Sequence, residues 1–391
     1  MNTLSKLQPQ KILIRSTNWI GDAVMTTPAV HTIRKNFPEA EITMLAVPWV
    51  ADIFRMSPDV DNLFIYDKKH LYQGKMKGPL RLAKDLKPFG FDMAILLQNA
   101  FEAALITKMA GIPVRAGYKR DGRGVLLTHG VTIAKETRKK HQVHYYQDML
   151  AALGLEKGPD HLRLPLVKSL EYWAEGFVDC LKYQSPVSHE EIDRIVGCEG
   201  LSEIQPMHRD RINIPVIGFN PGAAFGPAKQ WPVDKFAKLA ELICEHYGES
   251  GCVIMVFGTE ADTEAAKKIR TASARTSFHV LDMTGKTDLK QAMSFINCCD
   301  AFITNDSGLM HVAAGLNTPS IAIFGSTDHI ATGPFSETSI ILRREIECSP
   351  CLQTHCPKGH LRCLESISPQ DVYEDLARML STNLIANTPA P

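Results

Sequence analysis

The sequence predicts an α/β protein made of two doubly wound, Rossmann-like domains that face a cleft. Three observations support this fold class. The chain has 391 residues, too many for one ordinary hydrophobic core and suitable for two domains. Short aliphatic runs alternate with helical stretches along most of it, as in parallel sheets joined by crossover helices. This alternation is interrupted once, at residues 185–211, by a polar stretch that is rich in Glu and contains prolines.

We therefore expect an N-terminal domain over residues 1–184, a linker or insertion over 185–211, a C-terminal domain over 212–381 and a disordered tail over 382–391. In the first domain the predicted strands are 11–15, 41–46, 62–66, 91–97 and 114–118, and the predicted helices are 29–36, 50–56, 80–86, 100–110 and 141–153. In the second the predicted strands are 216–220, 252–257, 280–282, 301–305 and 320–324, and the predicted helices are 232–247, 263–272, 289–298 and 309–316. Such domains bind ligands at the carboxyl ends of their strands.

Composition and charge narrow the class of protein. Hydrophobic residues make up 45% and charged residues 22% of the chain, as in a globular protein. The first residues do not resemble a signal peptide, and no apolar run approaches the roughly 20 residues of a membrane span, so we expect a cytoplasmic location. Residues 1–182 hold 26 Lys and Arg against 18 Asp and Glu. This excess suits an anionic partner such as a phosphorylated lipid surface or an acidic sugar, although ordinary scatter of charge between domains explains it as well.

The first predicted strand leads directly into a candidate site. It is followed by a turn that contains Asn18 and Gly21, and Gly21 is expected to permit a tight backbone turn. Asp22 starts the next helical stretch, and Thr27-Pro28 resembles an N-cap and a first helical position, where a helix begins or kinks. An Asp in such a turn is more often a cap than a catalyst. The turn has no G-x-G-x-x-G pattern, so a dinucleotide is not expected here.

Two strand ends of the second half offer polar side chains. Gly222 follows strand 216–220, and Lys229 lies in the loop beyond it, where its ammonium is either a point charge for a phosphate or simply solvated. Glu260 follows strand 252–257, where a carboxylate can accept hydrogen bonds from a ribose or sugar hydroxyl. Asp262 beside it is more simply the N-cap of the next helix.

A third strand end is the most informative. Strand 301–305 enters the turn Asp306-Ser307-Gly308, and a helix is predicted from about residue 309, with His311 on its first turn. The small residues let an anion approach the backbone N–H groups of the helix N-terminus, where the helix dipole favours negative charge. A plain capped turn would explain Asp306 and Gly308, but not their combination with His311 and an Ala-rich helix face.

Together these segments resemble the ADP-heptose:lipopolysaccharide heptosyltransferases, an inverting family of glycosyltransferases with the GT-B fold. The resemblance covers nearly the whole chain and is carried by R-S-T-N-W-I-G-D-A-V-M-T-T-P-A, A-G-I-P-V-R-A-G-Y, K-Q-W-P, F-G-T-E and N-D-S-G-L-M-H-V-A-A-G-L, in that order. The Trp-Ile-Gly-Asp turn looks closest to the members that add the second heptose. The implied partners are ADP-heptose, the phosphorylated lipopolysaccharide inner core, and the inner-membrane surface as a peripheral contact. A monomer is expected, and no nucleic-acid partner.

The resemblance also implies residue roles. Asp22 would be the general base for the acceptor hydroxyl, and Lys229 would balance charge on the leaving diphosphate. Glu260 would bind the ribose or sugar. The diphosphate and donor sugar would be held by Asp306, Ser307, Gly308 and His311. This sequence departs from the family in having Ala223 and Ala224 where Thr or Ser often touch phosphate, so phosphate contacts there must come from backbone N–H groups or from elsewhere.

The implied chemistry needs no obligatory cofactor. A carboxylate activates the hydroxyl nucleophile, typically by about 10²–10⁴-fold, while a lysine and a helix N-terminus stabilise the departing ADP. Mg²⁺ bound with the nucleotide remains compatible with this pattern. Two other functions stay open at this point, namely a sugar-nucleotide epimerase of the same architecture and a non-catalytic regulator that binds a sugar nucleotide.

Four of the ten cysteines cluster near the C-terminus, as Cys348, Cys351, Cys356 and Cys363. Their C-x2-C-x4-C-x6-C pattern can be interpreted as a zinc site, but the spacing is irregular for standard structural zinc modules. A cytosolic location disfavours disulfides. A packed loop with free thiols is the third interpretation, and it is the simplest of the three.

Overall fold

The computed structural model describes residues 3–183, 214–248, 251–273 and 279–386, in two compact units, Met1–Pro165 and Leu166–Pro391. The linker predicted at 185–211 lies outside the described residues. The units divide earlier than the boundary expected after residue 184, because helix α7 (Lys168–Tyr183) packs in the second unit. Its Trp173 and Phe177 rings meet Phe295 of helix α11 edge-on, with centroids 4.8 and 5.4 Å away.

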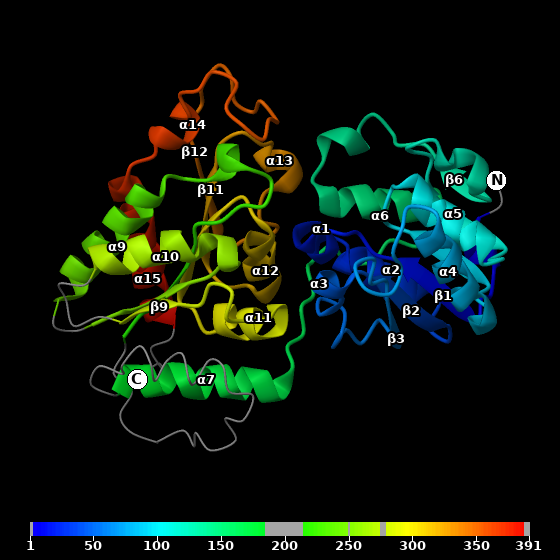
Figure 1. Ribbon diagram of the computed structural model, residues 1–391, viewed down its shortest axis with the longest axis horizontal. Helices are drawn as coiled ribbons and strands as arrows, with labels where there is room; N and C mark the ends of the chain where they lie inside the picture. The colour runs from blue at the N-terminus through cyan, green and yellow to red at the C-terminus, as the bar shows by residue number, and fades with distance from the viewer. Residues whose placement is uncertain (1–2, 184–213, 249–250, 274–278, 387–391) are drawn as a thin grey trace. The chain divides into compact units, whose positions relative to one another are not determined.

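The first unit contains a parallel six-stranded sheet with the order β3-β2-β1-β4-β5-β6 (Figure 1). The strands are β1 (Lys11–Arg15), β2 (Glu41–Ala46), β3 (Asn62–Ile65), β4 (Met93–Leu96), β5 (Val114–Tyr118) and β6 (His129–Val131). All five predicted strands are present, and β6 was not predicted. This strand order is that of a Rossmann fold, whose ligands bind where the order reverses, beyond β1 and β4.

The helices of the first unit cover both faces of its sheet. They are α1 (Ile20–Met25), α2 (Thr27–Asn36), α3 (Pro48–Ala51), α4 (Lys77–Leu86), α5 (Phe101–Met109) and α6 (Gln142–Ala152), with short 3-10 turns at Leu4–Lys6, Lys87–Phe89, Arg123–Leu126 and Thr137–Lys139. Apolar side chains of α4 and α5 form one core with β1, β2 and β4. Helices α2 and α6 pack together, and the buried Thr32 hydroxyl donates to Gln147 Oε1 at 2.8 Å.

The second unit repeats the same topology, with the sheet order β12-β11-β10-β7-β8-β9 and every pairing parallel. The strands are β7 (Val216–Asn220), β8 (Val253–Val256), β9 (His279–Asp282), β10 (Ala301–Asn305), β11 (Ser320–Phe324) and β12 (Ser339–Arg343). Central strands β7, β10 and β11 are buried at every residue, as expected for a parallel sheet covered on both faces. The sequence predicted all of these strands except β12.

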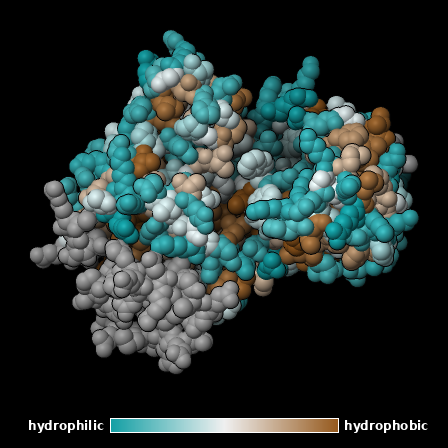
Figure 2. Space-filling model, in the orientation of Figure 1, coloured by the Kyte–Doolittle hydropathy of each residue, from teal (hydrophilic) through white to brown (hydrophobic). Residues whose placement is uncertain are grey.

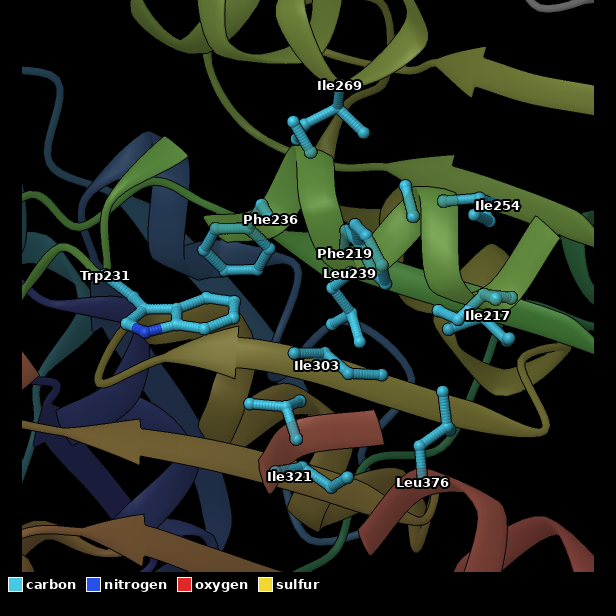
Figure 3. Close-up of a cluster of buried hydrophobic side chains, with 14 of the residues drawn as sticks. Ile217, Phe219, Trp231, Phe236, Leu239, Ile254, Ile269, Ile303, Ile321 and Leu376 are labelled. Carbon is cyan, nitrogen blue, oxygen red and sulfur yellow. The ribbon is translucent and has the colours of Figure 1, made fainter. Parts of the chain in front are cut away.

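One face of this sheet forms a large apolar core under α9, α10 and α15 (Figure 3). The helices of the unit, besides α7, are α9 (Val233–Tyr247), α10 (Thr263–Ala272), α11 (Leu289–Asn297), α12 (Gly308–Leu316), α13 (His329–Thr332), α14 (Arg362–Glu365) and α15 (Pro369–Ala386), with 3-10 turns at Pro227–Lys229 and Glu260–Asp262. In Figure 3 the ring of Trp231 lies beside Phe236, and isoleucines of neighbouring strands line the sheet below Leu239. Trp231 is fully buried and donates through Nε1 to Ile367 O at 3.1 Å.

Several helix ends differ from the sequence-based expectation. Gly21 was expected to form a tight turn before a helical stretch starting at Asp22, but α1 begins two residues earlier, at Ile20, and Gly21 is buried within it. Thr27 was expected to cap α2; it is instead the first helical residue and donates to Val24 O at 2.8 Å. The tail predicted to be disordered from residue 382 is helical through Ala386, as part of α15. Residues 387–391 lie outside the described chain.

Candidate active site

Asp22 lies just beyond the carboxyl end of β1, in the first turn of α1. Its side chain is partly exposed, whereas Gly21 and Ala23 on either side are buried. The carboxylate lies near Tyr146 of α6: burial raises the pKa of Tyr146 well above its usual value, and the negative charge of Asp22 adds to this. The nearby Thr17 hydroxyl is buried and has no hydrogen-bond partner within the described residues. Asp22 is therefore held at the ligand-binding edge of the sheet while remaining accessible.

A buried arginine supports the turn that carries Asp22. Arg15, the last residue of β1, is 1% exposed, and burial lowers the pKa of its guanidinium to about 10, so it keeps its charge at neutral pH. Its Nη1 donates to Ser16 O at 2.6 Å and its Nη2 to Asn18 Oδ1 at 2.8 Å. The carbonyl of Asn18 accepts from Trp49 Nε1 at 2.8 Å. Asn18 therefore joins the turn to Arg15 and to α3.

A second buried arginine lies beyond the carboxyl end of β5. Arg123 is 0% exposed, and burial lowers the pKa of its guanidinium to about 10. Its Nε donates to Tyr118 O at 2.9 Å and its Nη2 to Asn99 Oδ1 at 3.1 Å, and Nη1 bonds to Gln98 O. These acceptors are all neutral, so the positive charge is not cancelled by a carboxylate in contact. The first unit thus holds two buried cations beneath the edge that carries Asp22.

In the second unit, three of its loops meet at Asp306. Lys229, from the loop after β7, places Nζ 2.6 Å from Asp306 Oδ2. Thr327, from the loop after β11, donates its hydroxyl to the same carboxylate oxygen. The two charged side chains are largely buried, at 14% exposed for Lys229 and 4% for Asp306. The Lys229 ammonium also lies 4.8 Å from the ring centroid of Phe225. Lys229 is therefore held in a fixed position beyond the carboxyl end of β10.

Hydrogen bonds between β7 and β10 fix the turn that follows Asp306. The Asn220 side chain accepts from Ser307 Oγ at 2.7 Å and from Thr304 Oγ1 at 3.3 Å. The Asn305 side chain accepts from Trp231 N at 2.9 Å and donates to Pro221 O at 2.6 Å. Because all of these groups are buried or nearly so, the loops after β7 and β10 are held at a fixed separation.

Helix α12 begins at this turn. Ser307 is its N-cap, with its hydroxyl accepting from Met310 N at 3.4 Å, and Gly308 is the first helical residue, one position earlier than predicted. His311 lies in the first turn and is 4% exposed. The positive end of the helix dipole therefore points out of the same strand edge as Lys229. A lysine and a helix N-terminus at one edge can stabilise a diphosphate group.

Gly222 and Glu260 lie at the neighbouring ends of β7 and β8. A Cβ atom at Gly222 would lie 2.5 Å from Asp262 Oδ1, so Gly222 is needed for close packing rather than for a special backbone angle. Asp262 is the N-cap residue of α10, as expected, but its side chain makes no cap hydrogen bond to that helix. Its Oδ2 accepts instead from Thr259 N at 2.8 Å, in the capping box of the preceding 3-10 turn. Glu260 is exposed and packs over Gly285. It faces solvent at the strand edge, where a hydroxyl ligand can reach it.

The structure thus brings Lys229, Asp306, Ser307, Gly308 and His311 together at one edge, while Glu260 lies after the neighbouring strand. Sequence reasoning missed Thr327, although the polar run after predicted strand 320–324 was a signal for it. It also missed Arg15, an arginine that ends an otherwise apolar strand. Among the described helices, none is long and apolar enough to cross a membrane.

Comparison with known proteins relates the chain to one family of enzymes. The family model described as glycosyltransferase family 9 (heptosyltransferase) matches residues 79–362. The chain is 31% identical over 373 residues to lipopolysaccharide heptosyltransferase 2 of Escherichia coli strain K12, covering 95% of this chain and 98% of that one. The protein of the same name from Salmonella typhimurium is also 31% identical, over 375 residues, with 95% and 99% covered. A solved structure of the E. coli ADP-heptose heptosyltransferase II superposes with a TM-score of 0.71 at 28% identity, covering 95% of this chain and 99% of that chain.

Proposed function

The chain belongs to glycosyltransferase family 9, the heptosyltransferases, and is a glycosyltransferase; we propose that it transfers heptose from ADP-heptose to the heptose/Kdo inner core of lipopolysaccharide, with inversion at the anomeric carbon. The relatives of highest identity among those named above are heptosyltransferases 2, which supports addition of the second heptose. The observation that carries the proposal is that each unit has reactive groups at the carboxyl ends of its strands. The first unit has the accessible carboxylate of Asp22, and the second has Lys229 beside the N-terminus of α12.

The second unit is assigned to the donor. When the bond between the sugar and the diphosphate breaks, negative charge develops on the ADP leaving group, and Lys229 with the N-terminus of α12 stabilises it. Asp306 is a carboxylate and would repel a diphosphate, so its role is to orient Lys229 and the Thr327 hydroxyl rather than to bind phosphate directly. Glu260, exposed at the next strand end, accepts hydrogen bonds from the ribose or sugar. In this proposal no metal ion on the diphosphate is required, and a Mg²⁺ titration of the rate tests that point.

The first unit is assigned to the acceptor. Asp22 takes the proton of the attacking hydroxyl as the new glycosidic bond forms, a contribution of about 10²–10⁴-fold. Its position beyond β1, partly exposed and fixed by the Arg15–Asn18 contact, supports this role. The unit carries 24 Lys and Arg against 15 Asp and Glu, which favours an anionic, phosphorylated acceptor.

The acceptor is part of a membrane lipid, and we propose peripheral association through a basic and apolar segment, residues 67–84. This segment has six Lys or Arg and one Asp, and exposes Leu71, Met76 and Leu80 at 52%, 65% and 48%. Arg81 Nη1 donates to Leu71 O at 3.0 Å, which folds the loop onto the start of α4. Apolar side chains lie among hydrophilic ones on the visible surface of the first unit (Figure 2). Basic residues beside exposed apolar ones are typical of binding to anionic lipid surfaces.

Vesicle flotation tests this association. Binding to vesicles with anionic lipid should weaken at least about fivefold in Lys75→Glu, because each basic residue near an anionic surface contributes about 1 kcal/mol. The matched charge reversal Lys267→Glu, on α10 of the second unit, should leave binding unchanged. Equal binding of wild type to neutral and anionic vesicles, or no binding to either, would contradict the proposal.

Release of ADP from ADP-heptose tests the enzymatic proposal. Release should require an acceptor and should be faster with an inner core that already carries one heptose than with one that carries none. Consumption of ADP-heptose without acceptor would indicate an epimerase or a hydrolase instead. Binding of ADP-heptose with no turnover under any acceptor would indicate a regulatory protein.

A further inference from the structure

The four clustered cysteines line one small cavity in the second unit. Cys348, Cys351, Cys356 and Cys363 all contribute to its wall, and its volume is about 20 Å³. A single water-sized particle needs roughly 10–15 Å³ measured in this way, so the cavity accommodates one small ion and not a multi-atom cluster. Four cysteines from a span of 16 residues therefore line a space of single-ion size.

Two further features of the wall point to a ligand. Ser326 also lines the cavity, is 1% exposed, and its hydroxyl has no hydrogen-bond partner within the described residues. A buried hydroxyl without a partner is costly, and a ligand in the cavity would offer it one. Backbone N–H groups of Lys358 and Leu361, among others of that turn, bond to the Cys356 sulfur. The backbone of this turn therefore holds the Cys356 side chain beside the cavity.

The cysteine segment also supports the loop that carries Lys229. The carbonyl of Thr354 accepts from Ala228 N at 3.1 Å. A Cβ atom at Gly226 would lie 2.6 Å from that same carbonyl oxygen, so the two backbones are in close contact. The 3-10 turn that ends at Lys229 therefore rests directly on the segment between Cys351 and Cys356.

The same segment supports the loop that carries Thr327. Leu352 N donates to Ser326 O at 2.7 Å, and Ser349 Oγ donates to Gly325 O at 2.6 Å. Both side chains that bond to Asp306 thus come from loops that the cysteine segment contacts. At its other end, Cys363 belongs to the large apolar core beneath the sheet.

We propose that Cys348, Cys351, Cys356 and Cys363 bind one Zn²⁺ ion, which holds the cysteine segment rigid beneath the Lys229 and Thr327 loops. Four thiolates in tetrahedral arrangement are a standard structural zinc set, and binding releases the thiol protons. Within the described chain no three Cys, His, Asp or Glu side chains already stand in the geometry of a metal centre. In this proposal the ion draws the four thiols into that arrangement by rotation about χ1, a change between staggered wells. That the ion positions donor-binding loops rests on the proposed function; that it is bound does not.

Metal analysis of the full chain tests binding independently of catalysis. Protein purified under reducing conditions should contain one zinc per chain, and a thiol reagent should release it. Cys351→Ser should contain at least about tenfold less zinc. Cys298→Ser, which changes a cysteine at the end of α11 outside the cavity, should contain as much as wild type. Equal loss in both variants would overturn the proposal, and stoichiometric iron in place of zinc would overturn the choice of metal.

A second measurement needs no variant. Metal-free, reduced wild type titrated with Co²⁺ should develop sulfur-to-cobalt charge-transfer absorption and the visible bands of a tetrahedral site at one equivalent. Absence of these bands, with less than about a tenth of an equivalent of zinc as purified, would refute the site. The positioning role predicts that removing zinc weakens ADP binding severalfold and that adding it back restores binding. Unchanged ADP affinity would refute that role while leaving the metal site in place.

Discussion

Lys229→Met tests whether the lysine at the β10 edge acts in catalysis or only in folding. Methionine keeps much of the length of the side chain but removes the charge 2.6 Å from Asp306. Removing one partner of a fully buried pair costs about 3–5 kcal/mol, and an exposed pair contributes about 0–1 kcal/mol. Since Lys229 is 14% exposed and Asp306 4% exposed, we expect about 2 kcal/mol of lost stability, or about 4–8 °C in Tm.

The effect on catalysis should be larger and should respond differently to a second change. Losing one charge that stabilises the leaving group should lower kcat by about 10²–10³-fold in an ADP-release assay at saturating substrates. In the double variant Lys229→Met/Asp306→Asn, a neutral amide replaces the buried carboxylate, and the amide oxygen can still accept a hydrogen bond from Thr327. Stability should then recover by about half or more, because no unpaired charge remains, while kcat stays low.

Calorimetry and initial rates on the three proteins separate the two roles. The reasoning is refuted if Lys229→Met retains kcat within about threefold of wild type. It is also refuted if the double variant recovers activity along with stability, since Lys229 would then act only by neutralising Asp306.

Two further substitutions test other parts of the site. Arg15→Lys should lower kcat by about 10²-fold, because one ammonium cannot replace the contacts that fix the Asn18 turn before Asp22. Donor affinity, measured by titration calorimetry, should be unchanged. A matching loss of donor affinity would count against this role. Gly222→Ala should destabilise the fold by about 1–3 kcal/mol in chemical denaturation, because its Cβ would lie 2.5 Å from Asp262 Oδ1, and wild-type stability would contradict the packing inferred there.

Much of the fold could be predicted from local pattern alone. The strands at 11–15, 301–305 and 320–324 have the predicted bounds, because each is a short apolar run ended by polar turn residues. Parallel strands ending at one edge also explain why Lys229 and Asp306 could be placed in one site before their contact was known. The edge strands β6 and β12 escaped prediction because they are only partly buried and their patterns are weak.

Other features depend on contacts between distant parts of the chain. Nothing local shows that Arg15 and Arg123 are buried, because their acceptors are mostly backbone carbonyls supplied by the fold. Thr327 became part of the site only when β11 was placed next to β10. Helix α7 was not assigned from sequence, and its place in the second unit follows from aromatic packing on Phe295. The metal-binding role proposed for the four cysteines likewise rests on their shared cavity and not on their spacing.

The most direct test of the central claim compares wild type with Asp22→Ala in one experiment. With ADP-heptose and an inner-core acceptor carrying a single heptose, wild type should release ADP and yield an acceptor heavier by one heptose in mass spectrometry. Asp22→Ala should bind ADP-heptose with nearly wild-type affinity and yield no such product beyond about a 10²-fold slower background. Product formation by Asp22→Ala at the wild-type rate, or no heptosylated acceptor from wild type, would contradict the assignment.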